Sequence, residues 1–385
     1  MADSRTPPPR EDAPAAVDPR WQVPQISVVI GAVERDRFVH SAVESVLAQT
    51  LPRHQYEILV TRDFASSPVE GYLRANGVQS LWDPDRSQGR VVRAARAARA
   101  PLIAYLDDDD LFEPERLAEA LAVFRAHPEV SFYRNRVSVV NEAGDPTDPG
   151  EWDRLYLGSS LDRTGALLIE AGSKRARWTE ALESYPEFNL SSMILRREMV
   201  DGGAGTRLQQ MAARIDLGHF VEAYLAPGAI YLDDRRLTRY RLHRTNSSRI
   251  RVRPGQRVPR GWEDLGRLER RAVEQREARV ARWIRQKRIQ AGLGFHVDRL
   301  TRAVHDGAPT SAVSPYTREY LRFALRNPSA LVNPWSWRPF AYSIVQVAVP
   351  TLTRTRRADV ALRRDILANY PQGSWSELKS TVRGH

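Results

Sequence analysis

The chain has 385 residues, 42% hydrophobic and 27% charged, so it is long enough for a large core and for more than one structural unit. It contains no cysteine, which excludes disulfides, zinc–thiolate sites and cysteine nucleophiles. The net charge is +11, and residues 251–385 carry 26 Lys and Arg against 11 Asp and Glu, so the basic character belongs to the C-terminal third.

This charge asymmetry indicates an anionic partner for the C-terminal third, either a membrane surface or a nucleic acid; solvated arginine-rich helix faces would explain it equally well. We find no run of the ~18–20 apolar residues that a spanning helix needs. Residues 1–24 are rich in Pro, Ala and charge without the apolar core of a signal peptide, and we expect a disordered tail. The expectation is a cytoplasmic protein, with peripheral attachment to the cytoplasmic membrane face as a further option.

Residues 25–140 alternate between β-branched apolar runs and amphipathic helical patterns. Strands are predicted at 25–31, 56–61, 78–82, 102–106, 130–133 and 137–140, and helices at 38–48, 69–75, 89–100 and 114–126. This alternation predicts a mostly parallel sheet with helices on both faces. Residues 145–185 are less regular, and further strands are expected at 188–195 and 229–232, with a helix at 209–224.

From Trp262 onward the sequence character changes, and residues 263–290 form one long helical pattern, rich in basic residues, whose apolar stripe has gaps. An aromatic and aliphatic patch between Trp335 and Val349, followed by Arg354, Arg356 and Arg357, has the composition of a membrane-interfacial segment. A helix packed on the preceding domain fits it as well. We therefore expect a tail at 1–24, an α/β domain at 25–250 and a basic, mainly helical region at 251–385.

Four aspartates, Asp107 to Asp110, directly follow the apolar strand at 102–106. In an open α/β sheet the carboxyl ends of the strands form the ligand-binding edge. Grouped carboxylates there suit Mg²⁺ or Mn²⁺ and, through the metal, a phosphate-bearing ligand. An acidic loop or a helix N-terminus would also accept aspartates.

Other polar residues end neighbouring elements on the same predicted edge. Asp63 follows the second strand, and Gly89 and Arg93 begin the helix before the fourth. A nucleotide lying across this edge needs an acceptor for its base or ribose, a close backbone approach at a glycine, and a cation near its diphosphate. These three residues can supply them.

The stretches ISVVIGAVERDRFVHSAVESVLAQT, YEILVTRDF, QGRVVRAARAARAPLIAYLDDDDLFEPERL and YLDDRRLTRYRLHRTNSS resemble the inverting family-2 glycosyltransferases over about residues 25–250. The resemblance implies a GT-A fold, Rossmann-like, followed here by a helical C-terminal extension. It also implies a nucleotide-diphosphate sugar as donor, a divalent metal (Mn²⁺ or Mg²⁺), and a glycan or lipid-linked acceptor.

The resemblance also implies roles for individual residues. The donor-binding set is Ala32, Glu34, Asp63, Gly89, Arg93, Asp107 and Asp108, and the metal ligands are Asp107, Asp109 and His243. Arg62 stands where the family usually has an acidic residue, so uridine recognition is not assumed. Arg241 and Arg244 flank His243 and make this stretch an anion-clamp candidate, whereas a single His is also often just a hydrogen-bonded residue.

Asp216 matches the family's general base, at the start of a helix after the substrate-binding region, although the usual Glu-Asp pair is Ile-Asp here. Its carboxylate would accept the proton of the acceptor hydroxyl during a single inverting displacement. A helix-capping aspartate is the alternative. The pair Asp233-Asp234 is expected in a turn after a strand.

Two other functions compete with this one. A nucleotidyltransferase acting on sugar phosphates would share the sheet and acidic edge, but would carry a Gly-rich basic loop after the first strand, where Gly31-Ala32-Val33-Glu34 stands. A non-enzymatic nucleic-acid-binding protein would use the basic third, but we find no recognisable module for it and expect no nucleic-acid partner. We instead expect the basic third to help dock an enzyme on an anionic membrane surface.

Overall fold

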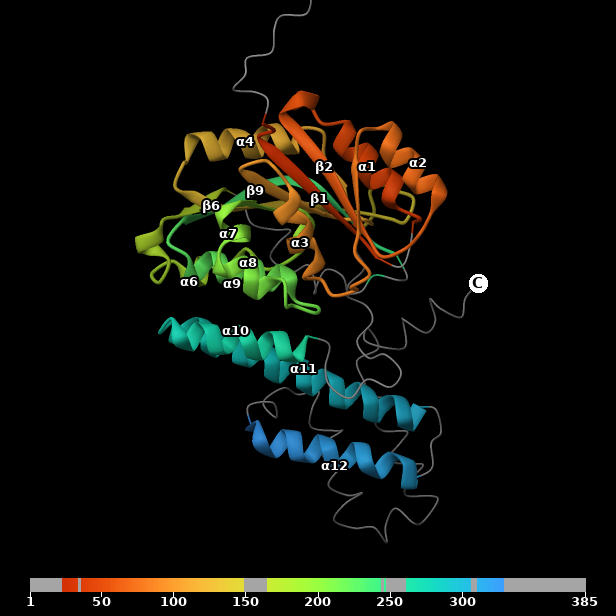
Figure 1. Ribbon diagram of the computed structural model, residues 1–385. Coiled ribbons are helices and arrows are strands. Elements are labelled where there is room, and N and C mark those ends of the chain that lie inside the picture. The colour runs from red at the N-terminus through yellow and green to blue at the C-terminus, as the bar shows by residue number, and fades with distance from the viewer. Residues whose placement is uncertain are drawn as a thin grey trace, which may run out of the picture.

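The computed structural model describes residues 23–33, 36–148, 165–243, 246, 261–305 and 310–328, except for the side chains of residues 297–298, 301–305 and 310–314. Within these residues an α/β domain lies above a layer of three helices (Figure 1). Most of the predicted N-terminal tail and the patch between Trp335 and Val349 lie outside the described residues.

Four parallel strands confirm the predicted first half of the sheet. They are β1 (Ile26–Ala32), β2 (Tyr56–Arg62), β3 (Gln79–Trp82) and β4 (Leu102–Asp107), in the order β3-β2-β1-β4. Gly31 pairs with Asp107, and Ala32 lies beside Arg62, so the ends of these strands meet at one edge. The apolar side chains of β1 and β4 are buried on both faces, as expected for a sheet covered on both sides.

In the described part of the chain, five further strands complete a nine-stranded sheet, and the antiparallel pairing of β8 with β4 joins them to the parallel part. They are β5 (Leu111–Phe112), β6 (Val130–Val140), β7 (Leu167–Ile169), β8 (Met193–Arg196) and β9 (Ala229–Arg241). From β4 the order continues β8-β6-β9-β5, while β7 pairs with β9. β6 and β9 are parallel, and β8 is antiparallel to both β4 and β6.

Three strand predictions need correction. The two strands predicted at 130–133 and 137–140 are one strand, whose register against β9 shifts near Asn135. The strand predicted at 188–195 begins only at Met193, because a 3₁₀ turn occupies Leu190–Ser192. The strand predicted at 229–232 continues to Arg241, so Asp233 and Asp234 lie within a strand rather than in a turn.

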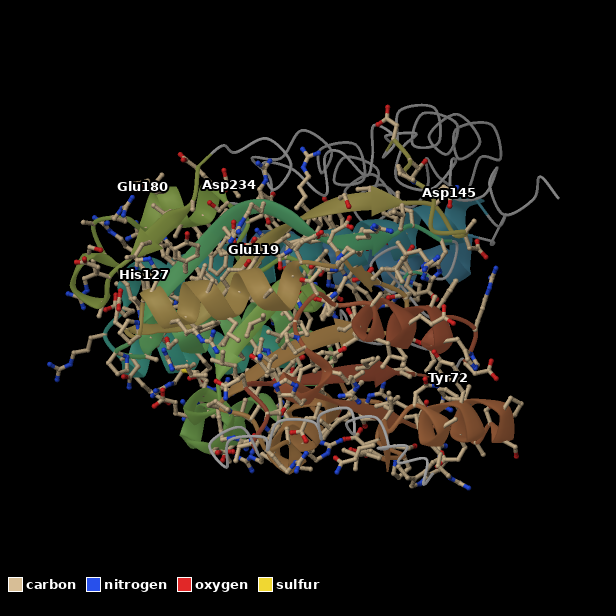
Figure 2. All side chains as sticks on the ribbon, turned by 90° about the horizontal axis from the view of Figure 1, so that it is seen from above. Tyr72, Glu119, His127, Asp145, Glu180 and Asp234 are labelled. Carbon is tan, nitrogen blue, oxygen red and sulfur yellow. The ribbon has the colours of Figure 1, made fainter. Side chains whose placement is uncertain are left out.

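Helices cover both faces of the sheet, as predicted. One face packs against α1 (Val39–Leu47), α2 (Ser67–Ala75) and α4 (Arg116–Ala126). In the view from above, Tyr72 marks α2 and Glu119 marks α4 (Figure 2). The other face packs against α3 (Arg90–Ala97), α6 (Trp178–Glu183), α7 (Glu198–Asp201), α8 (Gly203–Leu208) and α9 (Ile215–Leu225). The helix predicted at 209–224 therefore begins six residues later, at Ile215.

Three helices follow the sheet domain: α10 (Trp262–Glu274), α11 (Ala278–His305) and α12 (Thr310–Arg326). The single helix predicted over 263–290 is divided in two, with Arg276 between the halves at a φ of 57°. Leu265 and Leu268 of α10 and Ile284 of α11 belong to the same buried cluster as α9. Among the described residues, no helix combines the length and the apolar composition required to cross a membrane.

Candidate active site at the carboxyl edge of the sheet

The aspartate run lies at the carboxyl end of β4, beside the end of β1. Oxygen atoms of Asp107, Asp109 and Asp110 lie within 4.8 Å of one another. The amide of Asp108 donates to the carbonyl of Gly31 at 3.3 Å, which fixes the run against β1. Three carboxylates at this spacing supply the hard oxygen ligands that Mg²⁺ and Mn²⁺ prefer.

The electrostatics of this acidic corner also favour a cation. Burial, and after it the charges of Asp109, Asp110, Asp108 and Asp216, raises the pKa of Asp107 well above its usual range. Burial and Asp109 likewise raise the pKa of Asp110 to about 7. Carboxylates with raised pKa values repel one another when ionised, and a divalent cation between them relieves that repulsion. The residues present therefore fit a divalent metal.

Asp110 has a different environment from its neighbours. Its Oδ2 accepts hydrogen bonds from Asn189 Nδ2 at 2.7 Å and Ser191 Oγ at 2.6 Å, and its Oδ1 accepts from the amide of Arg241 at 3.0 Å. Both oxygens are thus engaged by the protein. Asp110 joins β4 to β9 and to the 3₁₀ turn before β8, which leaves Asp107 and Asp109 as the better placed ligands.

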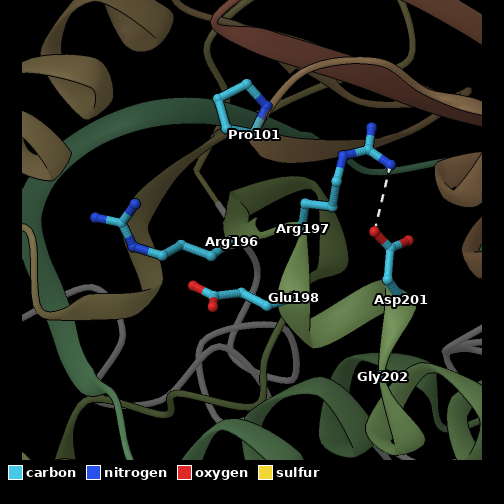
Figure 3. Close-up of a pocket in the computed structure, with 6 residues that line it drawn as sticks. All are labelled: Pro101, Arg196, Arg197, Glu198, Asp201 and Gly202. Atoms are coloured by element: carbon cyan, nitrogen blue, oxygen red, sulfur yellow. Dashed lines mark ion pairs between the residues drawn. The ribbon is translucent and has the colours of Figure 1, made fainter.

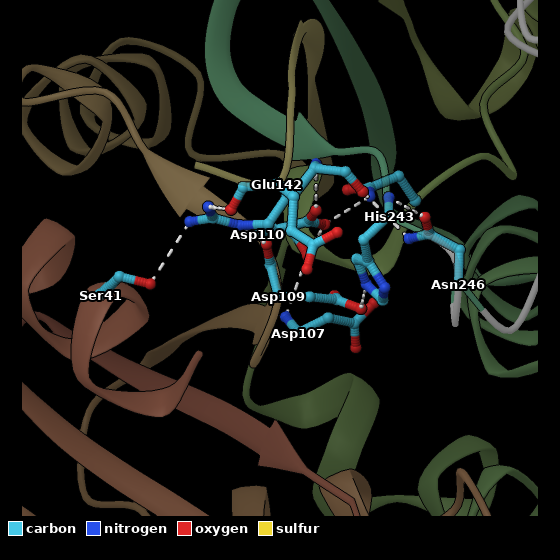
Figure 4. Close-up of polar contacts among 10 residues, drawn as sticks. Ser41, Asp107, Asp109, Asp110, Glu142, His243 and Asn246 are labelled. Atoms are coloured by element: carbon cyan, nitrogen blue, oxygen red, sulfur yellow. Dashed lines mark hydrogen bonds and ion pairs between the residues drawn. The ribbon is translucent and has the colours of Figure 1, made fainter. Parts of the chain in front are cut away.

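His243 reaches the acidic corner from the residues that follow β9 (Figure 4). Its Nε2 lies 2.9 Å from Asp109 Oδ2, and its amide donates to Asn246 Oδ1 at 2.6 Å. His243 is 5% exposed, and its ring lies 5.1 Å from the ring of Phe38, centroid to centroid, in a tilted arrangement. The structure therefore brings together His243 and Asp109, which are 134 residues apart in sequence.

The anion clamp expected around His243 takes another form. The Nε of Arg241 donates to the carbonyl of Asp109 at 2.7 Å, and its two terminal nitrogens bond to the carbonyl of Glu142 and to Ser41 Oγ. These bonds make Arg241 a tether between β9, the aspartate run and α1 (Figure 4). Arg244 lies outside the described residues.

Asp63 is held by cations at the end of β2. Its side chain is 1% exposed, and its oxygens lie 3.0 Å from Arg86 Nε and 4.0 Å from Arg90 Nη1. Arg62, the departure from the family pattern, donates instead to Ser80, Glu70 and the carbonyl of Phe64. Arg62 therefore joins β2, α2 and β3, and its guanidinium is occupied by these bonds.

Two predicted donor contacts of α3 are placed differently from the expectation. A Cβ on Gly89 would lie 2.1 Å from the carbonyl oxygen of Gln209. The group that approaches this glycine closely is therefore the backbone of Gln209, where a nucleotide was expected. Arg93 is paired with Asp83 and Asp85, both at 2.8 Å. Ala32 is buried at the end of β1, and Glu34 lies outside the described residues.

Arg90 is the cation that the sequence analysis missed. It is the first residue of α3 and is 1% exposed. Burial lowers the pKa of its guanidinium, and the charges of Asp63, Asp108 and Asp107 offset part of this effect. Within the described part of the chain, its Nη1 has no hydrogen bond. A buried guanidinium nitrogen without an acceptor, among strand ends, is suited to an anionic or carbonyl-bearing ligand.

Asp216 occupies the first turn of α9. Its Oδ1 accepts from the amide of Leu217 at 2.8 Å, so part of its acceptor capacity caps the helix. Burial raises its pKa, Arg214 lowers it, and Glu187 raises it. Since its charge also raises the pKa of Asp107, it lies within electrostatic reach of the acidic corner. A carboxylate with a raised pKa beside this acidic corner is equipped to accept a proton.

A pocket of about 590 Å³ lies at the opposite end of β4, lined by Pro101, Arg196, Arg197, Glu198, Asp201 and Gly202 (Figure 3). Arg196 donates to the carbonyls of Val130 and Pro128, and Arg197 donates to those of Ala98 and Ala100. Both guanidinium groups are thus used in holding loops, and this pocket is separate from the acidic corner.

An open α/β sheet covered on both faces, with carboxylates at the carboxyl edge of its central strand, has the GT-A architecture. Residues 27–185 match the family described as Glycosyl transferase family 2. The structure of TarS from S. aureus has a similar fold, with a TM-score of 0.51 and 15% sequence identity, over 90% of this chain and 55% of that chain.

Two curated relatives match part of the chain, and one of them is named as a glycosyltransferase. An uncharacterised glycosyltransferase of Haemophilus influenzae is 23% identical over 185 residues, which cover 44% of this chain and 62% of the relative. The uncharacterised protein y4gI of Sinorhizobium fredii is 26% identical over 194 residues, covering 45% of this chain and 20% of the relative. The matched region thus spans less than two thirds of either relative's length.

Proposed function

We propose that the chain is an inverting glycosyltransferase that moves a sugar from a nucleotide-diphosphate sugar to an acceptor hydroxyl. The observation that carries this proposal is the grouping of the Asp107, Asp109 and Asp110 oxygens at the end of β4, with the carboxylate of Asp216 in electrostatic reach. One group of carboxylates suits a metal-bound diphosphate, and the separate carboxylate suits an attacking hydroxyl.

In this proposal Asp107 and Asp109 hold a divalent metal, which supplies positive charge against the diphosphate when bound. His243 orients Asp109 through its 2.9 Å contact and joins the metal site if its Nε2 is released from that contact. Arg90 contributes a fixed cation beside the donor, and Asp63 is the acceptor for donor hydroxyl or base N–H groups. The identity of the donor's nucleotide base is left open, because Arg62 stands where the family usually has an acidic residue.

Asp216 then accepts the proton of the acceptor hydroxyl as that oxygen attacks the anomeric carbon and the nucleoside diphosphate departs. One displacement inverts the configuration, and no enzyme nucleophile is needed. The family match of residues 27–185 supports glycosyl transfer over the nucleotidyltransferase alternative.

The test is to measure release of nucleoside diphosphate from a panel of nucleotide sugars, with Mn²⁺, Mg²⁺ or EDTA. Asp109→Asn and Asp216→Asn should each lower kcat by about 10²-fold or more. Asp201→Asn, an exposed carboxylate of α7, is the matched control and should retain activity. Turnover that is unaffected by EDTA and by Asp109→Asn would contradict the metal-dependent mechanism.

We further propose that a lipid-linked or glycan acceptor is met at an anionic membrane surface. The net charge of +15 in residues 251–385 supports this, and Arg270, Arg276 and Arg282 are exposed on α10 and α11 or between them. Co-sedimentation with vesicles containing anionic lipid should be strong for the full chain and weakened in the triple Arg→Glu variant. Equal binding of both proteins, or binding that persists with neutral vesicles, contradicts electrostatic docking.

A further inference from the structure

The segment from Ser184 to Ser192 bonds both to the acidic corner and to β6. At its far end, Asn189 and Ser191 bond to Asp110, and Ser191 Oγ accepts from the amide of Asp107 at 2.9 Å. At its near end, the carbonyls of Ser184 and Phe188 accept from Arg134 of β6 at 2.9 and 3.2 Å. Displacement of this segment would therefore disturb the acidic corner directly.

The backbone of this segment needs support from its surroundings. Tyr185 has a φ of 47° and Asn189 a φ of 64°, both in the left-handed region. This region costs roughly 1–2 kcal/mol for residues other than glycine, and neighbouring contacts must compensate for it. Contacts to the segment are therefore expected to set its conformation.

One of these contacts comes from α11, outside the residues that match the family. Lys287 Nζ lies 2.7 Å from Glu187 Oε1, and the two side chains are 29% and 13% exposed. The same ammonium lies 4.6 Å from the ring centroid of Trp283, which packs against Trp178 and Phe220 in the core. Lys287 is thus anchored to the main body of the protein.

Charge links this contact to the proposed reaction. The negative charge of Glu187 raises the pKa of Asp216, whereas Arg214 lowers it. The charge of Asp216 in turn raises the pKa of Asp107. Arg134 of β6 also interacts electrostatically with Glu187. Without Lys287, the negative charge of Glu187 is less neutralised and the ionised form of Asp216 is less favoured.

We propose that Lys287 is a positioning residue for the transfer reaction, holding Glu187 and the 184–192 segment so that the helical region completes the acceptor side of the site. This inference rests on the proposed function for its catalytic consequence. Its structural part, the holding of the 184–192 segment, can be measured independently of activity.

The experiment uses the full chain and four variants: Lys287→Met, Lys287→Arg, Glu187→Gln and, as matched control, Arg285→Met. Arg285 lies two residues away on α11 and makes a 2.7 Å ion pair with Glu269 of α10 instead. Hydrogen exchange of the amides in 184–192 should be about tenfold faster or more in Lys287→Met, and close to wild type in Lys287→Arg and Arg285→Met.

The pH profile of nucleoside diphosphate release gives the catalytic readout. The acidic limb of kcat/KM should move to higher pH in Lys287→Met and to lower pH in Glu187→Gln, because the two changes alter the charge near Asp216 in opposite directions. Unchanged exchange in Lys287→Met, or equal changes in Arg285→Met, overturns the inference. Faster exchange with no turnover by any variant or by wild type supports the holding role and refutes the proposed function instead.

Discussion

The imidazole of His219 is fully buried one turn after Asp216, and its Nδ1–H donates to the carbonyl of Ile215 at 2.7 Å. Burial lowers its pKa to about 4. The unfolded chain binds a proton at this residue below about pH 6.5, whereas the folded chain does so only near pH 4. The free energy of unfolding therefore falls as the pH falls through this window.

We predict that His219→Gln removes this part of the pH dependence. Between pH 7 and pH 5, the free energy of unfolding of the wild type should fall by about 2 kcal/mol more than that of the variant. Urea denaturation at both pH values measures the difference. Parallel losses in the two proteins would mean that His219 is already protonated in the fold.

Arg90 and Arg93 make the second comparison between single residues. We predict that Arg90→Met weakens the binding of nucleoside diphosphate with Mn²⁺ by about tenfold or more, because it removes the buried cation beside Asp63 and Asp108. Arg93→Met should have a much smaller effect, since its guanidinium is paired with Asp83 and Asp85. Thermal shift titrations measure both affinities. A larger loss of affinity in Arg93→Met than in Arg90→Met would instead support Arg93 as the donor contact.

The sequence identified the acidic corner but not which arginine accompanies it. Asp107 to Asp110 follow a strand with a strong apolar signal, so their position could be read directly. Arg90 and Arg93 are three residues apart on one helix and face similar directions. The choice between them depends on how α3 packs on β1 and on the segment after α8, and local sequence carries no signal for that contact.

Whole strands and helices were predictable where their apolar patterns were regular. β1, β2 and β4 bury continuous apolar runs, and each begins within one residue of the prediction. The full length of β9 was not predictable, because six of the nine residues from Asp233 to Arg241 are charged. Asp233 bonds to Tyr133 and Arg235, and Arg239 pairs with Glu113. Tyr133 and Glu113 are remote in sequence from β9, so from the local sequence alone the segment looks like a polar turn.

The close contact of Gly89, the residue directly before α3, gives a prediction for the stability of the fold. Gly89→Ala would place a Cβ 2.1 Å from the Gln209 carbonyl and should destabilise the fold by about 3 kcal/mol or more. Gly71→Ala is the control, because nothing lies within 4 Å of its Cβ inside α2 and alanine favours helices; it should stabilise by up to about 1 kcal/mol. Chemical denaturation measures both, and similar values would refute the tight contact.

The proposed division at residues 24 and 250 separates segments of different sequence character. The apolar contacts nevertheless cross the second boundary, since Trp283 of α11 lies 5.4 Å from Trp178 and 6.0 Å from Phe220, centroid to centroid. The family match ends at residue 185, before α10 and α11, so it gives no information on how these helices pack. α10 and the first half of α11 act structurally as a further layer of the domain.

We therefore predict that the sheet and these helices unfold together. Near-ultraviolet and far-ultraviolet circular dichroism of the full chain should give coincident transitions. Trp283→Ala should lower the free energy of unfolding by about 3 kcal/mol, whereas Val273→Ala, at an exposed position of α10, should change it by less than about 0.5 kcal/mol. Two separated transitions would instead establish that the helices form an independent unit.

The length of β9 has a consequence for how the protein is made. The amide of Arg241 and the imidazole of His243 reach Asp110 and Asp109 across 131 and 134 residues. At about 5–20 residues per second, the aspartates are synthesised roughly 7–27 seconds before these partners. During that interval the nascent chain carries four adjacent carboxylates without their donors from β9. On the ribosome, the acidic corner is therefore assembled after the parallel strands that carry it.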